Sequence, residues 1–186
     1  DGMGDACDIF CMPGEPVMDR EGNLYSTVII GSQTWMAENL KTTKYNDGEA
    51  IPQVTADAAW QILTAPGYCW YNNDAANKSI YGALYNGYTV QTGKLCPAGW
   101  HVPLESEWKA LETYLGGSSG AGGKLKEPGI VHWSSPNVGA TNEVGFYARG
   151  GGDRWLNGAF TNYRDNGFWY ATDEADTDNA KSFYML

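Results

Sequence analysis

Residues 95–117 read LCPAGWHVPLESEWKALETYLGG, and the second half of this stretch predicts the clearest helix of the chain. Its apolar residues recur at the spacing of one helix face: Leu104, Trp108, Leu111 and Leu115. Such a stripe packs against a core. Glu105 and Glu107 stand at the positive N-terminal end of the helix, and Gly116 supplies a stop.

Shorter elements are expected before this helix. A turn at 21–23, a β-branched run over 25–30, a second turn at 31–32 and a strand through Trp35 predict a β-hairpin. TADAAWQIL, residues 55–63, predicts a short helix with Thr55 as its N-cap. Residues 1–18 mix Gly, Pro and Cys without periodicity, so we expect an irregular leader or the end of a linker, outside the folded domain of 19–186.

A glycine-rich stretch, GGSSGAGGKLKE, follows the helix at 116–127. A phosphate-binding loop needs the spacing GxxxxGK[ST] between a strand and a helix, and here Lys124 precedes Leu125. We therefore expect a flexible surface loop.

Composition limits the class of protein. A chain of 186 residues can bury a core as one domain, and 24 glycines with 8 prolines indicate many turns. The net charge of -10 argues against binding to nucleic acid or to an anionic membrane surface. No apolar run approaches the ~18 residues of a transmembrane segment. The chain opens on Asp1 without a signal-like segment, so an exported protein would already have lost its signal peptide.

The cysteines are Cys7, Cys11, Cys69 and Cys96, without a CxxC pair. This pattern gives little support for zinc and favours a disulfide, for which Cys7 and Cys11 are close enough. Four cysteines allow three pairings, and free buried thiols are an equal alternative.

Four strings carry a family resemblance: TWMAENLKTTKYNDGEAIP at 34–52, CWYNNDAANKSIYGALYNGYTV at 69–90, the stretch at 95–117, and HWSSPNVGATNEVGF at 132–146. Together they closely resemble the Fibrobacter succinogenes major paralogous domain, over residues 19–170. The family is abundant in secreted and surface proteins of Bacteroidetes. The resemblance implies an α+β, C-type-lectin-like fold with two helices, short antiparallel sheets and a long irregular loop region that carries the ligand face.

The chain departs from the family pattern in three places. Leu104 stands where members usually have Thr or Ser, which leaves Ser106 or a bound water to cap the helix. The usual WWSST-like string is replaced by FWYAT at 168–172. Members usually end in a GFSVRCVRD-like strand, whose cysteine would pair with the one equivalent to Cys96.

The chain as printed stops at Leu186 without that strand. Either it closes differently, with Cys96 pairing with Cys69 or both thiols staying reduced, or the sequence lacks its end. A lost strand would leave a sheet edge open to pairing with another chain.

Residues 133–186 are rich in aromatic residues, Asn and Gly, a composition that is poor at building helices or regular strands. Aromatic rings stack on sugar rings, while amides, carboxylates and guanidinium groups bond to hydroxyls. The candidate ligand-binding residues are Trp155, Asn157, Asn162, Tyr163, Arg164, Trp169 and Tyr170. The alternative is that Phe146, Phe160 and Trp169 fill the core. We divide the set, with Phe146, Phe160 and Trp169 mainly in the core and Trp155, Tyr163 and Arg164 mainly exposed.

Calcium is a possible cofactor of a C-type-lectin-like fold, because many C-type lectins use it to hold sugar hydroxyls. Asp173, Glu174, Asp176 and Asp178 are candidate ligands, with Asn179 beside them and a second oxygen-rich cluster at 72–74. The spacing is not that of an EF-hand, and neither cluster has the EPN or WND motif of calcium-dependent lectins. An ordinary acidic loop is the alternative.

Enzymatic chemistry has weak support. His101 and His132 lack partners at metal-ligand spacing, and Ser134 and Ser135 lack a GxSxG context. Formylglycine-generating enzymes share the implied fold but need a late cysteine pair, whereas this chain has no cysteine after Cys96. The acidic residues Glu105, Glu107, Asp153 and Glu174 follow no spacing typical of glycosidases.

The sequence therefore predicts a non-catalytic module of a bacterial surface or secreted protein that binds a glycan or a protein. The alternatives are a structural or tip subunit of a surface assembly such as a pilus, docking to other surface proteins, and a variable binding protein diversified by a retroelement.

Overall fold

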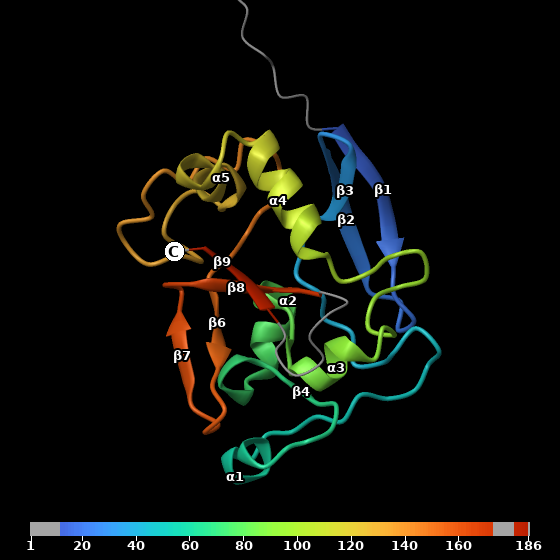
Figure 1. Cartoon of the computed structure of the whole chain (residues 1–186). Helices are drawn as coiled ribbons and strands as arrows, with labels where there is room; N and C mark the ends of the chain where they lie inside the picture. Colours follow the sequence, from blue (N-terminus) through green and yellow to red (C-terminus); the bar gives the residue numbers. More distant parts are fainter. Residues whose placement is uncertain (1–11, 173–180, 186) are drawn as a thin grey trace, which may run out of the picture.

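The computed structural model describes residues 12–172 and 181–185, which form a mixed α+β architecture of short helices and small antiparallel sheets (Figure 1). One sheet has the order β1 (Met12–Met18), β2 (Leu24–Ile30), β3 (Gln33–Met36). Three two-stranded sheets pair β4 (Tyr68–Cys69) with β5 (Leu84–Tyr85), β6 (Gly151–Arg154) with β7 (Phe160–Tyr163), and β8 (Gly167–Ala171) with β9 (Lys181–Met185). The predicted α+β class with short antiparallel sheets is confirmed.

The α-helices of the described residues are α1 (Asp57–Gln61), α2 (Lys78–Tyr81), α3 (Gly87–Gln91), α4 (Glu105–Tyr114) and α5 (Ser118–Leu125). Two short 3-10 turns precede α2, η1 (Tyr71–Asn73) and η2 (Ala75–Asn77). The prediction of two helices is therefore wrong in number, since it missed the short helices α2 and α3 between β4 and the 95–103 segment, and also α5. None of the helices in the described ranges is long and apolar enough to span a membrane.

Helix α4 confirms the strongest sequence prediction. Its N-cap residue Leu104 offers no capping side chain, and Glu107 Oε2 instead accepts a hydrogen bond from the Leu104 N–H at 2.8 Å. Trp108 and Leu111 are buried on its inner face. Gly116 takes a φ of 95°, which ends the helix at low steric cost. Helix α1 is also confirmed, although its N-cap is Ala56 and not Thr55.

The predicted hairpin is confirmed as β2 and β3. Val28 and Ile30 pair with Trp35 and Gln33, and the apolar members of these pairs are buried against α4. The expectation of an irregular segment through residue 18 is wrong for 12–18, because β1 pairs with β2 from Met12↔Ile29 to Met18↔Leu24. The β-branched strand β2 offers a second edge, and its ladder outweighs the weak strand propensity of MPGEPVM.

The glycine-rich stretch after α4 is helical, so the loop prediction is wrong. In α5, Ala121 is 2% exposed and Leu125 1%. A Cβ on Gly123 would lie 2.3 Å from the Gly139 carbonyl oxygen, so the helix and the 137–141 loop approach closely only because this residue has no side chain. Burial and close packing here override a low intrinsic helix propensity.

Two clusters of buried side chains hold the fold together. The larger joins β2, β3, α4 and α5 to residues 133–148, β8 and β9, and includes the Trp108 and Phe183 rings stacked at 4.7 Å. The smaller gathers Tyr45, Ile51, Tyr68, Trp70, Val90 and Leu95.

The region from residue 133 onward forms more regular structure than its composition predicts. Strands β6 to β9 all lie within it; in Figure 1, β6 and β7 lie on the side across from the three-stranded sheet, and β8 and β9 cross the middle of the molecule. Gly167 explains part of this, because a Cβ there would lie 2.3 Å from the ring of Trp169. The glycines let strands and rings approach closely, which compensates for their low strand propensity.

Candidate functional site

The β6–β7 hairpin carries the exposed aromatic residues that the sequence singles out. Trp155 N–H donates to the Ala159 carbonyl at 2.9 Å, and Gly158 N–H donates back to Trp155 at 2.9 Å. The Asn157 carboxamide accepts from Ala159 N–H at 3.0 Å. Asn157 therefore shapes the turn, and its carbonyl oxygen is already occupied within the hairpin.

Trp155 forms an aromatic platform at this tip. Its indole N–H donates to Thr161 Oγ1 at 2.7 Å, and that hydroxyl donates to Asp153 Oδ1 at 2.7 Å. Asn162, in the left-handed region at φ 58°, donates to the same carboxylate oxygen at 2.7 Å. These bonds fix the plane of the indole ring, while the residue remains 58% exposed.

Tyr163 extends the aromatic surface along β7. Its ring stacks on Tyr71 with centroids 4.8 Å apart and meets Tyr81 edge-on at 5.4 Å. Tyr163 is 41% exposed, so one part of the ring is packed and the other is available to a ligand. The predicted exposure of Trp155 and Tyr163 is confirmed.

Arg164 has a structural task. It adopts φ 64°, its guanidinium donates to the carbonyls of Ile130 and Trp133, and its own carbonyl accepts from Ser134 N–H at 2.6 Å. Arg164 is half-buried, so the prediction that it is exposed is wrong. Arg164 thus clamps the 130–134 loop against β7.

Trp169 and Tyr170 lie on β8 and face the interior. Trp169 packs against the larger core and donates its indole N–H to Asn39 Oδ1 at 2.9 Å. The Tyr170 hydroxyl donates to the Tyr85 carbonyl at 2.9 Å, and burial raises its pKa to about 12. Of the core assignments, Phe146 is buried, as expected, whereas Phe160 is half-buried.

Arg154 is a residue that sequence reasoning missed. Its side chain is fully buried and lies between the rings of Trp60 and Phe160, at 4.6 and 4.7 Å. It donates to the carbonyls of Gly158, Val54 and Thr55 and to Asp57 Oδ1. Arg154 thereby ties the hairpin that presents Trp155 to the segment leading into α1.

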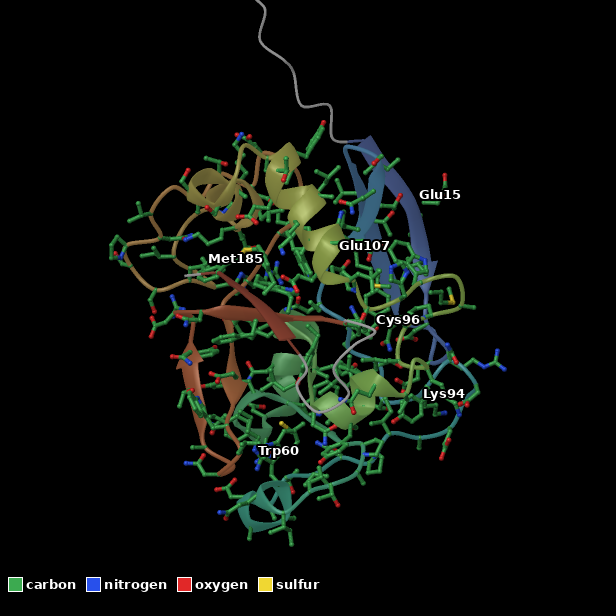
Figure 2. All side chains as sticks on the ribbon, in the orientation of Figure 1. Glu15, Trp60, Lys94, Cys96, Glu107 and Met185 are labelled. Atoms are coloured by element: carbon green, nitrogen blue, oxygen red, sulfur yellow. The ribbon has the colours of Figure 1, made fainter. Side chains whose placement is uncertain are left out.

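A cleft of about 970 Å³ runs beside these residues. Trp60 and Trp155 line one end, and Cys96, His101 and Glu107 belong to the lining nearer α4. Figure 2 shows Trp60 near α1 and the labels of Cys96 and Glu107 toward the three-stranded sheet, so the cleft spans much of the molecule. His101 Nε2 lies 2.8 Å from Glu107 Oε2, and His132 bonds to Glu127 Oε2 through its other ring nitrogen, Nδ1.

Cys69 and Cys96 are free thiols, so the alternative in which they pair is wrong. Burial raises the pKa of Cys96 to about 12 and also raises the pKa of Cys69, against the opposing influence of Arg154. Both thiols are therefore protonated at neutral pH. Cys7 and Cys11 lie outside the described residues.

The predicted calcium ligands Asp173, Glu174, Asp176 and Asp178 lie outside the described residues, so that site stays a prediction. Within 12–172 and 181–185, no three His, Cys, Asp or Glu side chains are grouped as metal ligands. In the cluster at 72–74, Asp74 Oδ1 accepts from Ala76 N–H and Asn73 donates to the Thr55 carbonyl. These bonds give both side chains local structural roles.

The fold and the cleft describe an α+β module with exposed aromatic residues on its β6–β7 hairpin. The family model of the Fibrobacter succinogenes major domain matches residues 28–185, so the chain belongs to this family. Comparison with curated proteins and with solved structures gave no match.

Proposed function

We propose that this chain is a non-catalytic binding module of a secreted or surface-anchored bacterial protein, and that it recognises a glycan through the face formed by Trp155 and Tyr163. The observation that carries the proposal is the Trp155 ring, which is 58% exposed and yet held in one plane by the Thr161 and Asp153 hydrogen bonds. A C-type-lectin-like fold is part of the proposal, supported by the short antiparallel sheets and the family membership.

A fixed aromatic ring suits a sugar ligand for two reasons. The apolar face of a pyranose ring covers the aromatic face and is thereby removed from water. Because the indole plane is already fixed, binding loses little side-chain entropy, which otherwise costs about 0.5–1.5 kcal/mol for each immobilised side chain. The platform is thus preorganised for stacking.

Polar groups beside the platform provide hydrogen bonds to hydroxyls. Asp153 is half-buried and its Oδ1 already accepts from Thr161 and Asn162, so Oδ2 is the oxygen that would accept from a ligand hydroxyl. The net charge of -10 disfavours uronic and sialic acids, so neutral sugars fit the face best.

A glycan array with the folded chain tests the proposal. Trp155→Ala should weaken binding to any positive glycan by about tenfold or more, given that aromatic contacts contribute about 0.5–1.5 kcal/mol beyond buried area. Tyr88→Ala is the matched control, because Tyr88 is 45% exposed on α3 and lies outside the cleft lining. Absence of binding across a broad array would refute the glycan proposal and favour a protein ligand.

A further inference from the structure

The outer edge of β3 has backbone groups that point away from its sheet. Val28 pairs with Trp35 and Ile30 with Gln33, and the Ala37 N–H donates to the Ser26 carbonyl at 2.8 Å. In an antiparallel ladder, the residues between such hydrogen-bonded pairs direct their N–H and C=O groups to the opposite side. Thr34 and Met36 are those residues, and no backbone hydrogen bond between described residues joins either to another segment.

The opposite edge of the same sheet is protected. Strand β1 contains Pro13 and Pro16, and its register with β2 shifts between Gly14 and Val17. Prolines and bulges are features by which proteins prevent pairing at a sheet edge. In this sheet, β3 is the edge that can extend a ladder.

Space for an added strand lies beside β3. All of β3 contributes to the lining of the 970 Å³ cleft, and residues 99–103 form part of the lining as well. Trp35 belongs to the same lining, is 7% exposed, and its indole nitrogen has no hydrogen-bond partner among the described residues. A buried donor without an acceptor costs free energy, and the carbonyl of an incoming chain is an acceptor of the kind it lacks.

The charges of the cleft indicate the chemistry of the occupant. Arg149 pairs with Glu127 at 3.0 Å and Arg154 with Asp57 at 2.8 Å, so the two arginines of the lining are neutralised by carboxylates. Glu38, Glu107 and Asp153 also line the cleft; Glu38 pairs with Lys41 at 3.3 Å, whereas Glu107 and Asp153 form no ion pair with a lysine or arginine among the described residues, in a chain with a net charge of -10. A basic polypeptide is therefore complementary to this surface.

We propose that the β3 edge binds an extended segment of a partner protein as an added strand, with apolar side chains at alternate positions and lysine or arginine at its ends. Backbone bonds to Thr34 and Met36 supply the affinity, and apolar contacts in the cleft select the sequence, as in other cases of strand addition. The β3 edge lines the same cleft as Trp155, but the strand pairing uses the backbone of Thr34 and Met36 and does not depend on the proposed glycan binding.

The probe is a panel of nonapeptides with lysine at both ends and Val, Ile, Leu or Phe alternating with Thr between them, together with KLYSTVIIK, which carries the β2 sequence. Fluorescence titration finds the binders, and amide hydrogen exchange by NMR locates them. We expect the Thr34 and Met36 amides to exchange at least about tenfold more slowly at saturation, while Gln33 and Trp35, already paired with β2, change little. Binding without this protection, or no binder in the panel at millimolar concentration, would overturn the proposal.

Two controls separate backbone pairing from simple apolar contact. The best peptide is made in two N-methylated forms, one at odd and one at even positions, and one form should lose at least about fivefold in affinity while the other binds normally. On the protein, Thr34→Pro removes one outward donor and leaves the β2 ladder intact, so it should weaken binding at an unchanged melting temperature. If Thr34→Pro fails to fold, the N-methylated peptides decide.

Equal affinity of the two N-methylated forms would overturn the proposal. So would a concentration-dependent dimer of the chain alone that protects the Thr34 and Met36 amides, because the edge would then belong to a second copy.

Discussion

Replacing Arg154 by methionine tests how the binding hairpin is held. Methionine keeps the apolar contacts with Trp60 and Phe160 but loses the hydrogen bonds to the Val54, Thr55 and Gly158 carbonyls, at 2.7, 2.9 and 2.9 Å. Hydrogen bonds to a charged group contribute about 1.5–3 kcal/mol each, and they are not additive when they share one donor group. We expect the free energy of unfolding to fall by about 3–5 kcal/mol.

The assay is urea unfolding followed by tryptophan fluorescence, with thermal melting in parallel. For a chain of this size, that loss lowers the melting temperature by roughly 6–20 °C. Asp57→Asn is the matched control, since the Asp57 side chain is 68% exposed and its ion pair should contribute less than about 1 kcal/mol. A loss below about 1 kcal/mol for Arg154→Met, or an equal loss for both variants, would refute the assignment of Arg154 as the anchor.

Three further predictions follow from other contacts. Gly123→Ala should destabilise the chain by about 1–3 kcal/mol, because its Cβ would clash with Gly139. Gly122→Ala has open space around its Cβ position and should stabilise α5 by up to about 1 kcal/mol. Equal effects of the two variants in urea unfolding would contradict the packing described for α5. Burial alone would raise the pKa of Asp19, but hydrogen bonds from Asn23 and Tyr25 outweigh it and lower that pKa. The ionised Asp19 carboxylate therefore stabilises the fold above its unfolded-state pKa of about 3.9, and this stabilisation is lost as pH falls toward the folded-state pKa. Between pH 5 and 3, Asp19→Asn should lose less stability than the wild type does. Parallel curves of unfolding free energy against pH for the two proteins would contradict this role of Asp19. Cys96, with its pKa raised to about 12, should be alkylated by iodoacetamide at pH 8 at least about tenfold more slowly in the folded chain than in urea, as followed by peptide mass spectrometry; similar rates would show that the thiol is accessible.

The elements predicted correctly from the sequence are those whose signals are local. The stripe from Leu104 to Leu115 repeats at the period of a helix, and the β-branched run before Gly31 is typical of a strand that enters a tight turn. Strand β1 and helix α5 have no such signal. They form because β2 offers a free edge and because Ala121 and Leu125 are buried against the rest of the core, conditions that exist only in the folded chain.

The candidate site shows the same division. Aromatic and amide residues at 155–170 marked the region, and Trp155 and Tyr163 are exposed as expected. The prediction that Trp169 lies mainly in the core is confirmed, but the sequence has no such signal for Tyr170. These neighbours on β8 pack against different clusters of buried side chains, and the cluster that covers Tyr170 is visible only in the folded chain. Arg154 could not be found at all, since its acceptors Val54 and Thr55 lie about a hundred residues away along the chain.

The glycan proposal is tested most directly at the Trp155 indole itself. With ¹⁵N-labelled tryptophan, addition of a neutral oligosaccharide identified on the array should shift the Trp155 indole N–H resonance in a saturable manner. The indoles of Trp108 and Trp133, which are 3% and 2% exposed, should stay unchanged. A saturable shift confined to other indoles, or a bound sugar that leaves the Trp155 signal in place, would contradict the proposal that this ring is the sugar-binding platform.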